Sequence, residues 1–215
     1  MKLAKGSSTW IGLPLACGLC CQIVGMLFWW FLGSILLFVA FICYLLTMTF
    51  LVFFRDPKRT VGDGIVACAD GTIREISLTN DETVGKTLRI STFMNIYNVH
   101  VNRMPFMGTI QVLTHHNGGY VPAFRKESER NERVELIVDT ALGTIKIVQI
   151  AGTLARRIQP YVHEGDLMEK GDKIGMIKLG SRVDVYLPER FIHHVVVQKG
   201  DRVKAGEDTL VKVNV

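Results

Sequence analysis

The chain carries no charged residue between Trp10 and Phe54. As a single helix this stretch would be roughly 68 Å long at the usual rise per residue, whereas the hydrocarbon core of a bilayer is only about 30 Å thick. It is also too long for the apolar part of a signal peptide. Two spans joined by a tight turn fit the length best, and Gly33-Ser34 is the expected break. The sequence therefore predicts a transmembrane hairpin within residues 1–54, with spans over 10–32 and 35–54.

Basic residues flank this hairpin at both ends. Lys2 and Lys5 precede it, and Arg55, Lys58 and Arg59 follow it. A hairpin places both its ends on the same side, and an excess of Lys and Arg marks the cytoplasmic side of a membrane. Residues 55–215 are therefore expected to form one cytoplasmic domain held at the cell membrane.

The composition of the segment after the hairpin excludes several classes of protein. The whole chain has a net charge of +5, which is too mild to indicate nucleic-acid binding, and no nucleic-acid-binding motif is present. Cys68 is the one cysteine after the apolar stretch, so no disulfide framework is expected there. Adjacent histidines on a strand point to opposite faces, so His115-His116 and His193-His194 do not predict a metal site.

The segment after the hairpin has the period-two alternation of β-strands. Strands are expected at 65–69, 72–76, 86–93, 108–113, 134–138, 144–150, 173–178, 182–187, 195–198 and 209–213. Short helices are expected at 94–97, 153–158 and 189–192. Residues 114–130 lack a clear period and are expected to form a loop.

An internal repeat occurs near the C-terminus. In residues 164–172 and again in 199–207, a Gly-Asp pair is followed six positions later by Gly and an acidic residue. This spacing is typical of barrel-sandwich domains of the lipoyl and biotinyl type, in which the glycines permit tight turns. The predicted fold is therefore mainly β, a lipoyl-like barrel-sandwich domain with short helices, preceded by the two-helix transmembrane hairpin.

The Gly180-Ser181 bond lies between the two copies of the repeat. A serine hydroxyl can attack the carbonyl carbon of its preceding residue, and glycine at that residue removes the steric obstacle. Elimination and hydrolysis would then leave a pyruvoyl group, but most Gly-Ser pairs are ordinary turns. Residues 93–105 raise the odds of a reactive site, because Asn98, His100, Asn102 and Arg103 interrupt an otherwise apolar strand and need partners if buried.

Several motifs together resemble the phosphatidylserine decarboxylase family, and most closely its short, membrane-anchored bacterial and archaeal-type form. They are Ala69-Asp70-Gly71, residues 98–103 with Pro105, Asn131-Glu132-Arg133, residues 149–152 with 155–158, and residues 180–188. They occur in the family order. The long forms of the family have threonine after the serine of the processing site, whereas this chain has Arg182, as the short forms commonly do.

The resemblance implies an enzyme that makes its own cofactor. Cleavage between Gly180 and Ser181 would give a β chain of residues 1–180 and an α chain of residues 181–215, with Ser181 converted to a pyruvoyl group. The family's triad maps onto Asp70, His100 and Ser181. His100 would act as general base, and Asp70 would fix its tautomer. Phosphatidylserine would then form a Schiff base, lose CO2 with His100 as proton donor, and leave as phosphatidylethanolamine.

Substrate contacts and the choice of substrate are less constrained. Asn98, Asn102, Arg103 and Arg133 are candidates for binding the headgroup of the membrane phospholipid. The oligomeric state is open, with a homodimer as one option. Three alternatives remain: archaetidylserine as the substrate, a pyruvoyl enzyme for a soluble amino acid, and a non-enzymatic barrel-sandwich binding or carrier module. The two spans argue against the soluble substrate, and Lys178 is a poor match to a carrier lysine.

Overall fold

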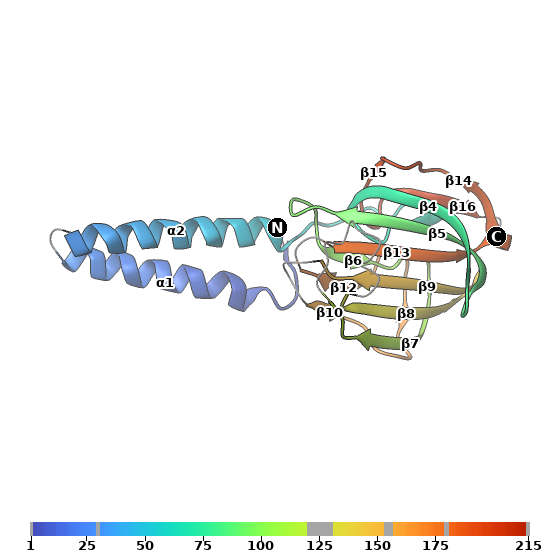
Figure 1. The fold of residues 1–215 in the computed structure, drawn as a ribbon, viewed down its shortest axis with the longest axis horizontal. Coiled ribbons are helices and arrows are strands. Elements are labelled where there is room, and N and C mark those ends of the chain that lie inside the picture. The colour runs from blue at the N-terminus through green and yellow to red at the C-terminus, as the bar shows by residue number, and fades with distance from the viewer. Residues whose placement is uncertain (1, 29–30, 120–130, 153–156, 179–180, 214–215) are drawn as a thin grey trace. The chain divides into compact units, whose positions relative to one another are not determined.

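The computed structural model describes residues 2–28, 31–119, 131–152, 157–178 and 181–213. The chain divides into two compact units, residues 1–57 and 58–215. The first is a helical hairpin and the second is almost entirely β (Figure 1). The predicted mainly-β fold with two N-terminal apolar helices is therefore confirmed.

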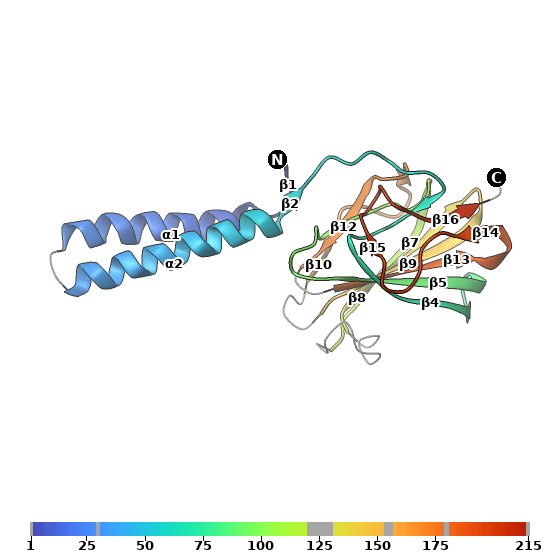
Figure 2. The ribbon, with the colours of Figure 1, turned by 90° about the horizontal axis from the view of Figure 1, so that it is seen from above.

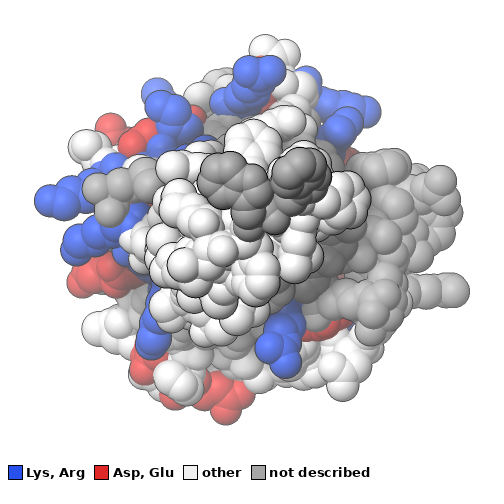
Figure 3. Space-filling model, turned by 90° about the vertical axis from the view of Figure 1, so that its left-hand side faces the viewer, with Lys and Arg blue, Asp and Glu red and all other residues white. Residues whose placement is uncertain are grey.

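The hairpin consists of α1 (Ser8–Leu27) and α2 (Phe31–Phe53), with a short pair of strands, β1 (Lys2–Leu3) and β2 (Arg55–Asp56), joining its two ends. Each helix is long and apolar enough to cross a bilayer. In Figure 3 the described parts of α1 and α2 that face the viewer form a surface without charged side chains. The helices are tied together by the Tyr44 hydroxyl, which donates to Gln22 Oε1, and by an edge-on contact between Trp10 and Phe50.

The expected break at Gly33-Ser34 is wrong. The first helix ends at Leu27, and Gly33 lies inside α2. A Cβ atom at Gly33 would come within 2.8 Å of the Gly25 carbonyl oxygen of α1. A Cβ there would come closer still to the carbonyl oxygen of Phe28, so glycine at this position serves the close approach of α2 to the end of α1 and to the residue that follows it.

The second unit is built on one eight-stranded antiparallel sheet in the order β11-β7-β8-β9-β13-β5-β4-β15. Figures 1 and 2 show that this sheet curls into a half-barrel. Its strands are β4 (Gly71–Asp81), β5 (Gly85–Met94), β7 (Gly108–His116), β8 (Arg133–Thr140), β9 (Gly143–Ile150), β11 (Leu167–Met168), β13 (Ser181–Pro188) and β15 (Arg202–Val203). The central position of β13 places the start of that strand inside the domain.

Two three-stranded sheets complete the unit. One has the order β10-β12-β6, and the other has the order β14-β16-β3. Their strands are β3 (Ile65–Val66), β6 (Val101–Arg103), β10 (Ile158–Pro160), β12 (Lys173–Ile177), β14 (Ile192–Val195) and β16 (Thr209–Val213). Apolar side chains of all three sheets form one core.

The alternation along β13 separates the core from a polar face of the large sheet. Val183, Val185 and Leu187 are buried in the core. Successive side chains of a strand point to opposite faces, so Arg182 and Asp184 lie on the other face. There they form an ion pair of 3.0 Å. Ser181 has the parity of Val183 and therefore points to the core side.

The repeat predicted from the sequence folds into matching turns. Gly165 and Gly200 have φ angles of +90° and +102°, which glycine adopts without strain. The aspartates that follow them accept equivalent hydrogen bonds, since Asp166 Oδ2 accepts from the His163 N–H and Asp201 Oδ2 accepts from the Gln198 N–H, both at 2.8 Å.

Some local predictions differ from the structure. Residues 94–97 are not helical, because Asn98 Oδ1 accepts a hydrogen bond from the Asn95 N–H at 2.8 Å and closes a turn instead, as asparagine side chains commonly do. The strand expected at 195–198 is β14 at Ile192–Val195. Residues 114–116 continue β7. The helix at 189–192 is confirmed as a short 3₁₀ turn, η2 (Glu189–Phe191). Residues 120–130 and 153–156 lie outside the described residues.

Candidate active site

Ser181 is the first residue of β13, and its position is fixed by β5 on one side. Its register partner there is Met94, and Arg182 pairs with Phe93. Ser181 is fully buried, and its Oγ has no hydrogen-bond partner among the residues that the structure describes. A buried hydroxyl without a partner costs roughly 1–3 kcal/mol, so the site calls for an explanation other than stability. The predicted partner in cleavage, Gly180, lies outside the described residues.

His100 lies immediately before β6 and is fully buried. Its carbonyl oxygen accepts a hydrogen bond of 3.3 Å from the Ile177 N–H at the end of β12, the strand that leads to Ser181. Its Nδ1 atom lies 2.9 Å from the Asn98 carbonyl oxygen. A carbonyl oxygen only accepts, so Nδ1 carries the proton and Nε2 holds the lone pair in the neutral ring. This tautomer suits a general base acting through Nε2.

Asp70 immediately precedes β4 and is almost completely buried. Arg59 Nη2 donates to its Oδ2, and the Ala205 N–H donates to its Oδ1, both at 2.8 Å. Burial raises the pKa of Asp70, while the hydrogen bonds from the main chain of Ala205 and Val99 and the Arg59 charge oppose that rise. Because Val99 adjoins His100, Asp70 holds the main chain of the histidine loop.

The fixing of the His100 tautomer was assigned to Asp70 on the family resemblance. In the structure the Asn98 carbonyl oxygen performs that task at Nδ1. The role of Asp70 in processing stays a prediction, and its contact with Val99 suggests that it would act through the loop.

Two buried hydrogen bonds connect Gln149 and Asn102 with Met94, the register partner of Ser181. Gln149 Nε2 on β9 donates to Asn102 Oδ1 on β6 at 2.7 Å, and Asn102 Nδ2 donates to Met94 Sδ at 3.6 Å. These hydrogen bonds therefore link three strands at the point where β13 begins, and they give Asn102 a positioning role that does not require contact with substrate.

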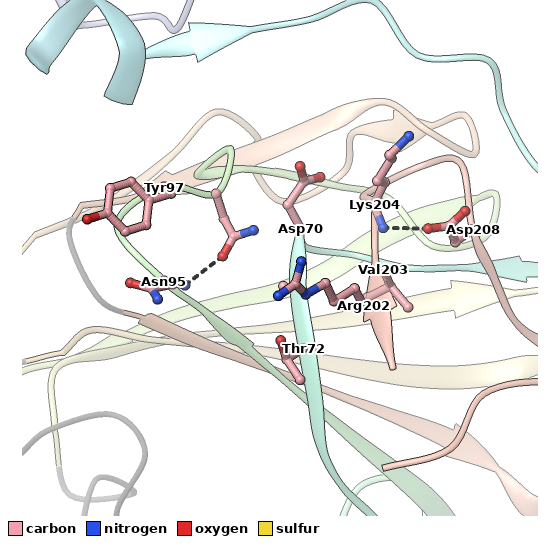
Figure 4. Close-up of a pocket in the computed structure, with 10 residues that line it drawn as sticks. Asp70, Thr72, Asn95, Tyr97, Arg202, Val203, Lys204 and Asp208 are labelled. Atoms are coloured by element: carbon pink, nitrogen blue, oxygen red, sulfur yellow. Dashed lines mark hydrogen bonds between the residues drawn. The ribbon is translucent and has the colours of Figure 1, made fainter. Parts of the chain in front are cut away.

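The two arginines proposed for headgroup binding already have protein partners. Arg103 is buried, and its Nη1 donates to the Gly171 carbonyl oxygen at 2.9 Å. Arg133 Nε donates to Glu135 Oε1 at 2.8 Å. Their roles in binding stay predictions. Asn98, the fourth candidate, lines a cavity of about 440 Å³ that also reaches Asp70 (Figure 4).

The predicted histidine pairs make ordinary contacts where they are described. His115 Nε2 lies 3.0 Å from Glu132, and His116 Nε2 lies 3.4 Å from Glu135. Within the described ranges, no group of three His, Cys, Asp or Glu side chains is arranged to hold a metal ion. Burial raises the pKa of the Cys68 thiol to about 12, which makes this side chain a poor nucleophile at neutral pH.

Comparison with known proteins identifies similar sequences. A family model described as phosphatidylserine decarboxylase matches residues 46–211. A phosphatidylserine decarboxylase proenzyme of Streptomyces griseus is 51% identical over 155 residues, covering 72% of this chain and 69% of the relative. A protein of Methanococcoides burtonii, provisionally named archaetidylserine decarboxylase proenzyme, is 39% identical over 220 residues, covering 98% of this chain and 96% of the relative.

The chain belongs to the phosphatidylserine decarboxylase family. The family and the enzymatic activity predicted from the motifs are thereby confirmed, and the non-enzymatic carrier or binding module is excluded.

The sequence motifs missed some residues of the site. Arg59 neutralises Asp70 from the beginning of the domain, and no local pattern connects the two. Arg202 and Lys204 line the cavity beside Asp70. The sequence shows that both residues belong to the second copy of the repeat. It does not show that they lie near Asp70, because they are far from it along the chain.

Proposed function

We propose that this chain is the self-cleaving precursor of a membrane-bound decarboxylase that converts phosphatidylserine to phosphatidylethanolamine and CO2. The observation that carries the proposal is the environment of Ser181, a fully buried hydroxyl with no partner among the described residues. It stands at the start of a central strand, inside the region matched by the family.

In the proposed cleavage, Ser181 Oγ attacks the carbonyl carbon of Gly180 and gives up its proton to His100 Nε2. The C–O bond forms, His100 returns the proton to the departing nitrogen of Ser181, and the C–N bond breaks, which converts the peptide to an ester with a free amine. Elimination then transfers the α proton of Ser181 to a base and breaks the Cβ–O bond, which releases Gly180 as a carboxylate and leaves a dehydroalanine. Hydrolysis of its enamine consumes one water, releases ammonia and produces the pyruvoyl group. The tautomer held by Asn98 supports His100 as the base, because it directs the lone pair of the ring to Nε2.

The pyruvoyl group supplies a ketone that accepts the amine of the serine headgroup and withdraws electrons from the departing carboxylate. The buried start of β13 supports this use, since it keeps the new N-terminus of the α chain away from bulk water. His100 Nε2 would hold the proton that is returned to the α carbon after CO2 leaves. The link from Gln149 through Asn102 to Met94 would orient the main chain at Ser181.

The hairpin of α1 and α2 is proposed to anchor the enzyme in the cytoplasmic membrane, with residues 55–215 on the cytoplasmic side. Both helices are long and apolar enough to span the bilayer, and basic residues lie at both ends of the hairpin. Tethering would keep the catalytic domain at a high local concentration of its lipid substrate.

Archaetidylserine is a second candidate substrate. The Methanococcoides relative covers 98% of this chain, which includes the hairpin, whereas the more identical Streptomyces relative covers 72%. The reacting headgroup is the same in both lipids, so the proposed chemistry is unchanged.

The paired glycine turns also support a barrel-sandwich arrangement of the C-terminal strands. The turns at Gly165 and Gly200 have the same hydrogen bonds and the same sign of φ. Such a quasi-twofold arrangement would place Ser181 between two equivalent halves and give the cleaved α chain many contacts that retain it.

The function is tested by incubating the purified full chain in detergent micelles with serine phospholipids labelled at the serine carboxyl carbon. The proposal expects labelled CO2 and an ethanolamine lipid, and no CO2 from free serine. Parallel assays with diacyl and archaeol backbones decide between the two substrates. Absence of CO2 from both lipids, in a preparation shown to be cleaved, would overturn the proposal.

A further inference from the structure

A polar cavity of about 440 Å³ lies between the start of β4 and the second copy of the repeat (Figure 4). Its lining comes from three segments that are far apart in the sequence. They are residues 70–72, residues 95–98 on the turn before His100, and residues 202–208 of the cleaved α chain. The cavity therefore brings the histidine loop and the C-terminal repeat to one place.

Two basic side chains, those of Arg202 and Lys204, line this cavity. Arg202 is exposed, and no ion pair or hydrogen bond of its side chain is found within the described part of the chain. Figure 4 shows its side chain extending from β15 toward Asp70 and Thr72. Lys204 Nζ lies 3.6 Å from Glu207, with 64% of its side chain exposed, so that pairing is weak.

The carboxylates of the cavity are already neutralised or hydrogen-bonded. Asp70 forms an ion pair of 2.8 Å with Arg59, and Glu207, which is outside the lining, lies 3.2 Å from the same arginine. Asp208 Oδ2 accepts a hydrogen bond of 2.7 Å from the Lys204 N–H. The guanidinium of Arg202 is therefore the group in this cavity best able to take a new anion.

The order of strands relates the cavity to the reactive serine. Ser181 pairs with Met94 of β5, the neighbouring Phe93 pairs with Thr72 of β4, and Thr72 pairs with Arg202 of β15. All these residues lie at the same end of the sheet. Neighbouring strands are about 4.8 Å apart, so β4, toward which Arg202 extends, is roughly 10 Å from the strand of Ser181. Because register partners share a face, Thr72 and Arg202 lie on the face of Arg182, opposite to Ser181, and a ligand joins the two by passing the end of β5.

This separation matches the length of a serine headgroup. Its amine nitrogen and its phosphorus are joined through four covalent bonds, and a charge-assisted hydrogen bond from a guanidinium to a phosphate oxygen adds about 2.8 Å. A headgroup whose amine is bound at residue 181 would therefore present its phosphate to the cavity by passing the end of β5, where residues 95–98 line the cavity. The planar guanidinium of an arginine suits a phosphodiester, which offers two oxygens to a bidentate donor.

We propose that Arg202 and Lys204 form the subsite for the phosphodiester of the serine phospholipid. The inference rests on the proposed function and adds the residues that grip the substrate. It replaces Arg103 and Arg133 in that role, because both already donate to protein acceptors. It also gives the cleaved α chain two functions, since that chain would supply both the reactive carbonyl and the phosphate contacts.

The first test measures binding without turnover. In the uncleaved Ser181→Ala chain, glycerophosphoserine is expected to bind at least tenfold more tightly than free serine, and Arg202→Ala with Lys204→Ala should abolish that difference. Inorganic phosphate should bind more weakly than glycerophosphoserine. Equal binding of inorganic phosphate would indicate a general anion site and overturn the headgroup assignment, as would an unchanged preference in the double variant.

The second test uses the cleaved enzyme. Loss of charge-assisted hydrogen bonds in Arg202→Ala, Lys204→Ala should raise the KM for phosphatidylserine about ten- to hundredfold, with self-cleavage and the melting temperature unchanged. Arg202→Lys should be intermediate. Lys199→Ala, an exposed lysine of the same repeat outside the cavity, should leave KM unaltered. Normal cleavage and CO2 release with an unchanged KM would defeat this subsite alone, whereas no cleavage or CO2 release by the natural chain would defeat the proposed function itself.

Discussion

The Nδ1 atom of His100 lies 2.9 Å from the main-chain oxygen of Asn98. The carbonyl fixes the tautomer without a carboxylate, so the imidazole presents a basic Nε2 even though it is fully buried. The histidine can therefore be prepared for proton transfer by the turn at Asn95–Asn98, which the same asparagine side chain closes.

His100→Ala is expected to slow self-cleavage by a factor of about 10² to 10⁴, the usual contribution of a general base. The rate is measured by following the appearance of the two chains on a denaturing gel after synthesis. His115→Ala is the matched control, because that histidine lies in an exposed contact with Glu132. Cleavage at the natural rate in the His100 variant would remove this residue from the maturation step.

Asp70 is expected to make stability depend on pH in a defined direction. Burial raises its pKa above the usual 3.8 despite the opposing hydrogen bond from Ala205 and the Arg59 charge. The folded chain thus holds this proton more tightly than the unfolded chain. The stabilisation it gives is complete below the usual pKa and is lost as the pH rises through the raised one.

Melting temperatures of the full chain in detergent, measured from pH 3.5 upward, check this sign. The advantage of the natural chain over Asp70→Asn should shrink as the pH rises. Asp63→Asn, a change at an exposed carboxylate outside the cavity, is the control. An advantage that grows with pH would show that Arg59 dominates and that the pKa of Asp70 is lowered.

Gln149→Leu is expected to destabilise the domain by about 1–3 kcal/mol, because Asn102 Oδ1 loses a buried donor at 2.7 Å. Cleavage should also slow, since Asn102 contacts Met94, the register partner of Ser181. Thermal unfolding and the cleavage gel measure the two effects separately. Gln159→Leu, at a half-buried position of β10, is the control and should change neither stability nor the cleavage rate. If Gln149→Leu also changed neither, the hydrogen bonds from Gln149 through Asn102 to Met94 would have no role in cleavage.

Gly206→Ala is expected to cost more stability than Gly200→Ala. Both glycines have positive φ, at +77° and +102°, so each alanine incurs roughly 1–2 kcal/mol of backbone strain. A Cβ at Gly206 would also lie 2.9 Å from Arg103 Cδ, whereas Gly200 has no atom within 4 Å. The overpacking should add about 1 kcal/mol or more. Equal losses of stability in the two variants, measured by thermal unfolding, would show that the Arg103 side chain moves aside at no cost.

The sequence predicted the strands of the large sheet well because their alternation reports burial on one face. Val134 and Leu136 of β8 illustrate this, since both are fully buried and Glu135 between them is only half-buried. It did not predict the short strands β6, β10, β11 and β15, which have too few residues to show a period. Their pairing is set by distant partners, as when Arg202 pairs with Thr72.

The sequence predicted those residues of the candidate site that belong to a local motif. Ser181, His100 and Asp70 each stand in a recognisable motif, but the partners of Asp70 do not. Arg59 and Ala205 reach it from opposite ends of the domain, and only the folded chain brings them together. The break between the helices was misplaced for a related reason, since Gly33 can serve either a turn or a close helix contact.

The mass of each polypeptide in the purified protein tests the central claim most directly. The account predicts two chains, residues 1–180 ending in a carboxylate and residues 181–215 beginning with a pyruvoyl group in place of serine, while Ser181→Ala remains a single polypeptide of 215 residues. A natural chain that stays whole and still releases CO2 from phosphatidylserine would contradict it.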